Sequence, residues 1–271
     1  MPDWLQIARG DAPLIVSMPH TGTDIPADIE EPLVSPWLAR KDADWHLEQL
    51  CDFAPELGAT VVRTTMSRTV IDVNRDPSGA SLYPGQATTE LCPTTTFDGE
   101  PLYCAGRGPD ADEIMRRRAA WFEPYHAALG AELQRLRRRH SKVVLFEAHS
   151  IRSVIPRLFD GELPNFNIGT NSGEACNASL TASIESVCDR TSFSRVTNGR
   201  FKGGWTTRHY GKPAEGIHAI QLELACRGYL DEPPEVSPDN WPTHYSEQRA
   251  AEMRDALGNI MQACLTFART P

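Results

Sequence analysis

The chain has 271 residues, of which 40% are hydrophobic and 23% charged, the composition of a globular protein that can bury a sizeable core. A formal net charge of −9 argues against a nucleic acid bound over a broad basic face. Seven cysteines without a CxxC pair, no signal-peptide pattern and no long apolar run predict a cytoplasmic protein with reduced thiols and no membrane contact.

Short apolar runs alternate with helical patterns in the first part of the chain. Residues 14–18 predict a buried strand, residues 37–53 a helix, and the β-branched runs 59–63 and 69–73 two further strands. Residues 82–103 are rich in Thr, Pro and Gly without periodicity. This stretch predicts a long loop, and long loops in compact domains are usually functional.

The alternation continues to the end of the chain. Residues 110–139 are the strongest helical stretch, and Pro124 within it predicts a kink or a break. Four elements follow: a buried strand at 142–146, a helix at 176–187, a strand at 218–224 and a closing helix at 241–267. The pattern predicts a single α/β domain over residues 1–271, with a mixed, mainly parallel sheet and helices on both faces.

Two histidines follow predicted strands. In α/β sheets ligands bind beyond the carboxyl ends of the strands, where His20 and His149 lie. Neutral imidazole is a common metal ligand, and catalytic zinc takes three protein ligands and a water. One such histidine is more often structural, but two at one edge indicate a metal site. The third ligand stays open between Asp44, which also suits a helix N-terminus, and Asp24.

Asn74 and Arg75 directly follow the predicted strand at 69–73. Arginine presents a rigid fork that grips a carboxylate through two hydrogen bonds, and asparagine adds a donor. A surface turn is the alternative, because the next residues, Asp76 and Pro77, favour turns. Their place after a buried run favours a site for a substrate carboxylate.

Polar residues in and before the late strand complete the candidate set. Glu223 lies within an apolar run, where burial would raise the pKa of its carboxyl towards a value useful for proton transfer. A glutamate facing solvent from an edge strand is the equal alternative. Near the glycines that precede this strand, Arg208 is a candidate for a second substrate carboxylate, and His209 for positioning or protonating the substrate.

The order His, Asn-Arg, His, Glu at strand ends resembles the zinc carboxypeptidase fold. The chain is more similar still to the N-formylglutamate deformylase (N-formylglutamate amidohydrolase) family, which acts in histidine breakdown. Six motifs carry the resemblance and span most of the chain: SMPHTG at 17–22, DADWH at 42–46, SRTVIDVNR at 67–75, EAHSI at 147–151, TTRHYG at 206–211 and HAIQLE at 218–223.

The resemblance implies a zinc-dependent amidohydrolase that converts N-formyl-L-glutamate to L-glutamate and formate, with another divalent transition metal as the alternative to Zn²⁺. It implies these roles: Zn²⁺ ligands His20, Asp44 and His149, general base Glu223, oxyanion stabiliser Arg68, and carboxylate-binding residues Asn74, Arg75 and Arg208. The alternatives are an amidohydrolase for other N-acyl amino acids or short peptides, and a binding protein of the same fold without catalysis.

The sequence departs from the related patterns at two positions. Carboxypeptidases carry a His-x-x-Glu ligand motif, but Thr23 stands at the third position after His20, which favours Asp44 as the remaining ligand. Glu147 stands where the deformylase family is expected to carry Asp. Its longer side chain changes the surroundings that orient His149.

Overall fold

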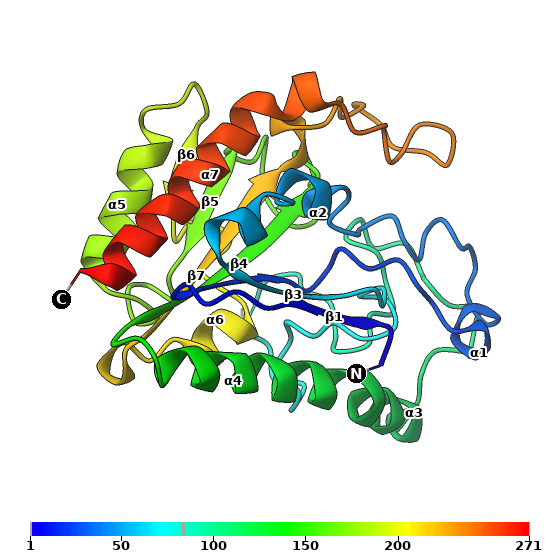
Figure 1. Ribbon diagram of the computed structural model, residues 1–271. Helices are drawn as coiled ribbons and strands as arrows, with labels where there is room; N and C mark the ends of the chain where they lie inside the picture. The colour runs from blue at the N-terminus through cyan, green and yellow to red at the C-terminus, as the bar shows by residue number, and fades with distance from the viewer. Residues whose placement is uncertain (1, 83–84, 271) are drawn as a thin grey trace.

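A seven-stranded sheet forms the centre of the computed structural model, which describes residues 2–82 and 85–270 (Figure 1). In spatial order its strands are β1 (Leu5–Ala8), β3 (Thr60–Thr64), β2 (Leu14–Met18), β4 (Val143–Ile151), β7 (Ile217–Ala225), β5 (Phe166–Gly169) and β6 (Arg195–Thr197). The pairs β3–β2, β2–β4, β4–β7 and β5–β6 are parallel, whereas β1–β3 and β5–β7 are antiparallel. The predicted mixed, mainly parallel α/β sheet is confirmed.

Helices cover both faces of the sheet (Figure 1). On one face lie α2 (Leu47–Leu50), α5 (Ala178–Cys188) and α7 (Glu247–Arg269), and on the other α3 (Ala111–Arg117), α4 (Glu123–Arg137) and α6 (Trp205–Tyr210). The short helices that remain are α1 (Ala27–Glu30) and the 3₁₀ turns Ala54–Leu57, Pro213–Glu215 and Cys226–Gly228. No helix in the described ranges has the length and apolar character to cross a bilayer, and the cytoplasmic location stays a prediction.

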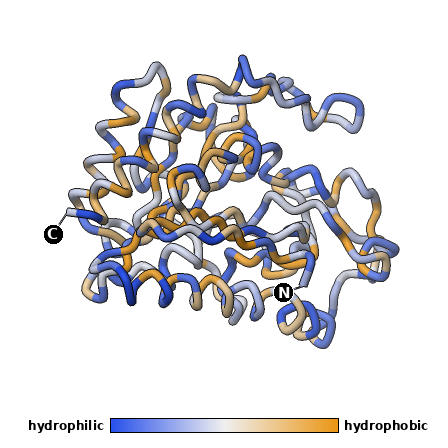
Figure 2. The backbone as a smooth tube through the Cα atoms, in the orientation of Figure 1, coloured by the Kyte–Doolittle hydropathy of each residue, from blue (hydrophilic) through white to orange (hydrophobic). Residues whose placement is uncertain are grey.

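Strand β4 divides the hydrophobic core between these two layers. Phe146 packs in the cluster that includes residues of α5 and α7, and its neighbour Leu145 packs in the cluster that includes residues of α4. All nine residues of β4 are buried, as expected for a central parallel strand with both faces covered. Figure 2 shows the apolar segments concentrated along this central sheet.

The register of the central strands places the polar residues of the site on one face. His149 pairs with Glu223 across β4 and β7, and Ser17 pairs with Glu147 across β2 and β4. Because side chains alternate along a strand, Glu147 and His149 project to the same side as Leu145. His149 lies inside β4, which continues beyond the predicted end at residue 146.

Two predicted elements are wrong in the segments that lead to the site. Of the helix predicted at 37–53, only Leu47–Leu50 is α-helical, because His46 takes a left-handed φ of 59° and residues 36–46 form turns. The run 69–73 is buried but is no strand. Its Asp72 N–H instead donates to the carbonyl of Leu91 at 2.7 Å. Burial of β-branched residues therefore does not require a sheet partner here.

The long helical stretch and the long loop match their predictions. Between α3 and α4 lies a π-helical turn, Arg118–Phe122, and Pro124 sits in the first turn of α4. The helical backbone continues through this π turn, since Phe122 and Glu123 keep right-handed helical dihedrals, so the irregular turn marks the place where the proline lacks an N–H donor. The described residues of 82–103 contain no helix or strand. The short strands β1, β5 and β6, of three or four residues each, were not predicted.

Candidate metal centre and active-site cavity

Three buried side chains converge at the edge of the sheet. The Nδ1 atom of His149 lies 3.1 Å from Asp44 Oδ2, and His20 Nδ1 lies 3.9 Å from the same oxygen. One ligand atom from each of these residues lies within 4.8 Å of the other two. Asp24, the other candidate for the third position, is exposed and lies outside the group.

The local backbone brings Asp44 to the histidines. His20 lies just beyond the end of β2, and its carbonyl accepts the N–H of Asp44 at 2.9 Å. The left-handed turn at His46 then starts α2 immediately after this contact. Asp44 is therefore held by a turn and a long-range backbone bond, and the helix predicted there would have prevented both.

The group fits a divalent transition metal. His20 Nδ1 is buried and has no hydrogen-bond partner in the described part of the chain, so a strong donor atom faces the centre of the group. Tetrahedral zinc with ligands about 2.0 to 2.2 Å away separates ligand atoms by roughly 3.4 Å. The two distances to Asp44 Oδ2, 3.1 and 3.9 Å, lie on either side of that value.

Electrostatics also favour a cation in this group. Burial by itself lowers the pKa of His149, yet the carboxylates of Asp44, Glu147 and Glu223 raise it well above its usual value. The negative charge around His149 thus attracts a proton when no other cation is present. Burial and the nearby Arg68 lower the pKa of His20, which keeps this imidazole in the neutral form that binds metals.

Asp72 orients the first histidine. Its Oδ1 lies 2.7 Å from His20 Nε2 and accepts the backbone N–H of Asn74, while its Oδ2 accepts from Arg68 Nη2 at 2.6 Å. Burial alone would raise the pKa of Asp72, but His20, Arg75 and Arg68 hold it well below its usual range. A carboxylate on the far nitrogen of a ligand histidine fixes its tautomer and ring orientation.

The second histidine has two polar neighbours on its far nitrogen. Asn74 Nδ2 lies 3.0 Å from His149 Nε2, and Glu147 Oε1 lies 3.7 Å from the same atom. The other carboxylate oxygen of Glu147 accepts from Thr207 Oγ1 at 3.0 Å. The longer side chain at position 147 therefore links His149 to the start of α6.

The first turn of α6 sets the orientation of two side-chain amides. The N–H of Thr206 donates to Asn74 Oδ1 at 2.9 Å, and the N–H of Gly204 donates to Gln221 Oε1 at 2.7 Å. With both oxygens occupied, the NH₂ groups point into the site, and Gln221 Nε2 donates to Glu223 Oε2 at 3.3 Å. Gly204 has to lack a side chain, because a Cβ there would lie 2.4 Å from Asn74 Nδ2.

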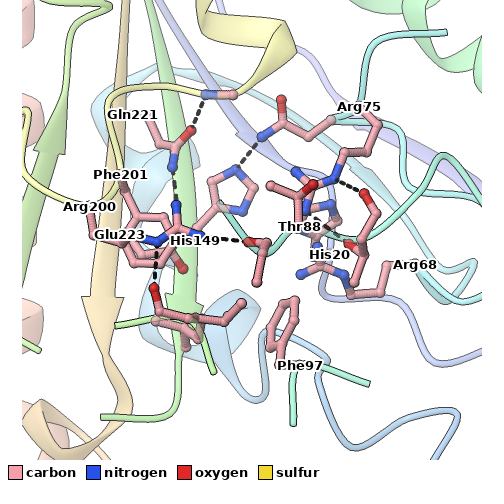
Figure 3. Close-up of a pocket in the computed structure, with 16 residues that line it drawn as sticks. His20, Arg68, Arg75, Thr88, Phe97, His149, Arg200, Phe201, Gln221 and Glu223 are labelled. Carbon is pink, nitrogen blue, oxygen red and sulfur yellow. Dashed lines mark hydrogen bonds between the residues drawn. The ribbon is translucent and has the colours of Figure 1, made fainter. Parts of the chain in front are cut away.

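A cavity of about 590 Å³, measured with its open mouth, contains the two histidines and Glu223 (Figure 3). Glu223 is only 7% exposed, and burial raises the pKa of its carboxyl to about 7 against the opposing effect of His149. The buried alternative for Glu223 is thus the one observed, with a pKa suited to proton transfer near neutral pH.

Three arginines line the same cavity. Arg68 is buried, bonded to Asp72 and stacked over the ring of Phe97 with its Cζ 4.6 Å from the centroid. Arg75 donates through Nε and Nη2 to the carbonyl and hydroxyl of Thr89, at 3.0 Å each. Arg200 lines the opposite side in Figure 3.

Two predicted substrate contacts are not found at the cavity. Arg208 Nε donates to the carbonyl of Gly203, and the exposed ring of His209 stacks on Trp205 with centroids 4.1 Å apart. Neither residue lines the cavity. Asn74 does line it, but its amide is engaged by His149 and Thr206, so it acts on a histidine as well as facing the cavity.

Three residues of the site were not predicted from the sequence: Asp72, which contacts His20, Gln221 beside Glu223, and Arg200. Asp72 and Gln221 lie two or three residues from predicted site residues, Asn74, Arg75 and Glu223, a proximity that is a usable signal. For Arg200, the sequence signal is its position just before the glycines at 203–204.

Comparison with known proteins gives consistent matches. A sequence profile described as N-formylglutamate amidohydrolase matches residues 12–230. An N-formylglutamate deformylase of Pseudomonas aeruginosa is 44% identical over 270 residues, covering 99% of this chain and 98% of that protein. One from Pseudomonas putida is 45% identical over 264 residues, covering 97% and 96%. The crystal structure of an N-formylglutamate amidohydrolase from Ralstonia eutropha JMP134 superposes with a TM-score of 0.80 at 26% identity, covering 98% of both chains.

Proposed function

This chain belongs to the N-formylglutamate amidohydrolase family, and we propose that it hydrolyses N-formyl-L-glutamate to L-glutamate and formate. One observation carries the proposal: the two histidines of a buried His-Asp-His group line a cavity together with a buried glutamate and three arginines. The His-Asp-His group supplies a metal site, and the glutamate supplies a general base. The positive charge of the arginines suits a substrate that carries carboxylates. Its proposed place is the breakdown of histidine.

We propose Zn²⁺ as the cation. It would be held by the Nδ1 atoms of His20 and His149 and by the carboxylate of Asp44, and when bound it supplies Lewis acidity to the formyl carbonyl and to water. Asp72 holds the ring of His20 by its Nε2 atom, and the carboxylate of Glu147 faces Nε2 of His149, the nitrogen that carries the proton when Nδ1 binds the metal. These contacts keep both Nδ1 atoms directed at the same point.

Glu223 is the proposed general base. Its carboxylate accepts a proton from the attacking water and then delivers it to the amide nitrogen as the C–N bond breaks, which leaves formate and the free amine. Gln221 holds one of its carboxylate oxygens, so the base keeps its orientation between the two proton transfers. Arg68 lines the cavity and places positive charge where the carbonyl oxygen becomes negative. Arg75 binds a substrate carboxylate.

The test combines metal analysis with a substrate panel. We expect about one zinc per chain, turnover of N-formylglutamate that stops on chelation and returns with Zn²⁺, and lower kcat/KM for N-formylaspartate and N-acetylglutamate. Activity that persists in a metal-free preparation would contradict the mechanism. A higher kcat/KM on another N-acyl amino acid or a short peptide would identify that compound as the preferred substrate. Binding without turnover would indicate a non-catalytic protein.

A further inference from the structure

Two of the three cavity arginines are bonded to the same short piece of backbone. Arg200 Nη2 donates to the carbonyl of Ala87 at 2.8 Å. Arg75 donates to the carbonyl and the hydroxyl of Thr89, two residues further along. Residues 87–89, which line the cavity with both arginines, form neither a turn nor a bend.

This shared segment limits the distance between the two guanidinium groups. Carbonyls two residues apart lie at most about 7 Å from each other, and one hydrogen bond of roughly 3 Å at each end brings the bonded nitrogens to within about 13 Å. In Figure 3 Arg200 and Arg75 lie on opposite sides of His149, with Thr88 between them. The two cations therefore lie on either side of His149 in this view, and their bonds to residues 87–89 limit how far apart they can be.

Arg200 is anchored at a second point. Its Nε donates to the carbonyl of Leu158 at 2.7 Å, and its Cζ lies 5.4 Å from the ring centroid of Phe201. Carbonyl oxygens carry no formal charge, so these two bonds hold the guanidinium in place, and arginine stays protonated at all physiological pH values. Leu158 and Phe201, which contact Arg200, belong to the apolar part of the cavity lining, as does Ile151.

We propose that Arg200 binds the side-chain carboxylate of the substrate, while Arg75 binds its α-carboxylate. The apolar lining beside Arg200 suits the methylene groups of a glutamyl side chain. In an extended glutamate the two carboxyl carbons lie about 5 Å apart, and a paired guanidinium carbon about 4 Å beyond each gives a total of about 13 Å. The bonds to residues 87–89 allow a separation of this size, so one glutamate can lie between the two arginines.

This role of Arg200 rests on the proposed function and supplies a physical basis for selecting acidic substrates. The arginine pair recognises two carboxylates on one substrate, and we expect a substrate one C–C bond shorter to reach both guanidinium groups less well. Shortening or neutralising the side chain therefore removes the contact with Arg200, while the contact with Arg75 persists.

The experiment compares N-formylglutamate with N-formylglutamine, which has nearly the same shape but a neutral side chain. We expect the wild-type enzyme to prefer N-formylglutamate by roughly 10- to 100-fold in kcat/KM, the effect of one charge-assisted contact. The R200M variant should lose that preference: kcat/KM should fall by a similar factor for N-formylglutamate and less than about 3-fold for N-formylglutamine. The R200K variant should recover part of the preference.

Two further variants define the comparison. Arg157, which donates to the carbonyls of Thr96 and Phe97 but does not line the cavity, gives a matched control, and R157M should leave the preference intact. R75M should lower kcat/KM for both substrates alike, because both keep the α-carboxylate. Equal losses on both substrates in R200M, or no loss on either, would overturn the inference.

The wild-type data separate this inference from the proposed function and apply even if a variant fails to fold. Turnover of both substrates without a preference for the charged one contradicts the role of Arg200 and leaves the amidohydrolase activity standing. Turnover of neither contradicts the proposed function itself.

Discussion

Replacing Asp72 by asparagine tests how the first histidine is held. Asp72 is fully buried and receives hydrogen bonds from His20, Arg68 and the backbone of Asn74, with Arg75 Nε 3.6 Å away. Asparagine has the same shape but offers one acceptor oxygen and one NH₂ group. If its oxygen faces His20 and Asn74, its NH₂ group faces the guanidinium of Arg68, which can only donate.

The size of the effect follows from the burial of the pair. Removing one partner of a buried ion pair costs about 3 to 5 kcal/mol, because the remaining charge loses its compensation. We therefore expect D72N to lower the free energy of unfolding of the metal-free protein by about 3 kcal/mol. Loss of an orienting group on a ligand histidine lowers metal affinity by about 10- to 100-fold, and we expect a zinc affinity reduced within that range.

Two measurements separate stability from metal binding. Urea unfolding in the presence of a chelator gives the stability of the metal-free protein, and competition with a chromophoric chelator gives the zinc affinity. Asp76, a partly exposed neighbour that accepts from the N–H of Ser78, provides the matched control. D76N should change the free energy of unfolding by less than about 1 kcal/mol. A folded D72N that binds zinc as tightly as the wild type would refute this account of the site.

Three further predictions follow from the same site. Because burial raises the pKa of Glu223 to about 7 and only the deprotonated carboxylate accepts a proton, kcat/KM should rise with pH up to about 7. E223Q should lose about 100-fold or more in kcat above pH 7 and less below it, where the wild-type carboxyl is protonated, and a variant as active as the wild type above pH 7 would remove Glu223 from its role. G204A places a Cβ against Asn74 and should lower kcat/KM by about 10- to 100-fold, whereas G108A, whose Cβ meets nothing within 4 Å, should leave it unchanged. Removing the metal should lower Tm by about 5 to 10 °C, the loss of roughly 2.7 kcal/mol of binding at a metal concentration 100 times Kd, and an unchanged Tm would contradict a structural contribution of the ion.

The sequence by itself determined the central strands β2, β4 and β7 and pointed to several residues of the candidate site. The runs at β2, β4 and β7 are apolar because both faces of these strands are covered, and this pattern is legible without any partner. Residue chemistry at the ends of these runs then identified His20, His149 and Glu223. The apolar runs and the polar residues near their ends are both local features of the chain, so they can be recognised from the sequence alone.

The tertiary structure decided which polar atoms meet. Asp44 faces the histidines and Asp24 does not, because a turn replaces the predicted helix and binds the carbonyl of His20. Arg200, and not Arg208, lines the cavity because loop carbonyls far away in the chain hold it there. The two Arg200 bonds join residues that are 42 and 113 positions apart in the chain, and the Asp44 contact depends on the turn at His46. No periodicity encodes such contacts, since their energy exists only once the sheet has brought the loops together.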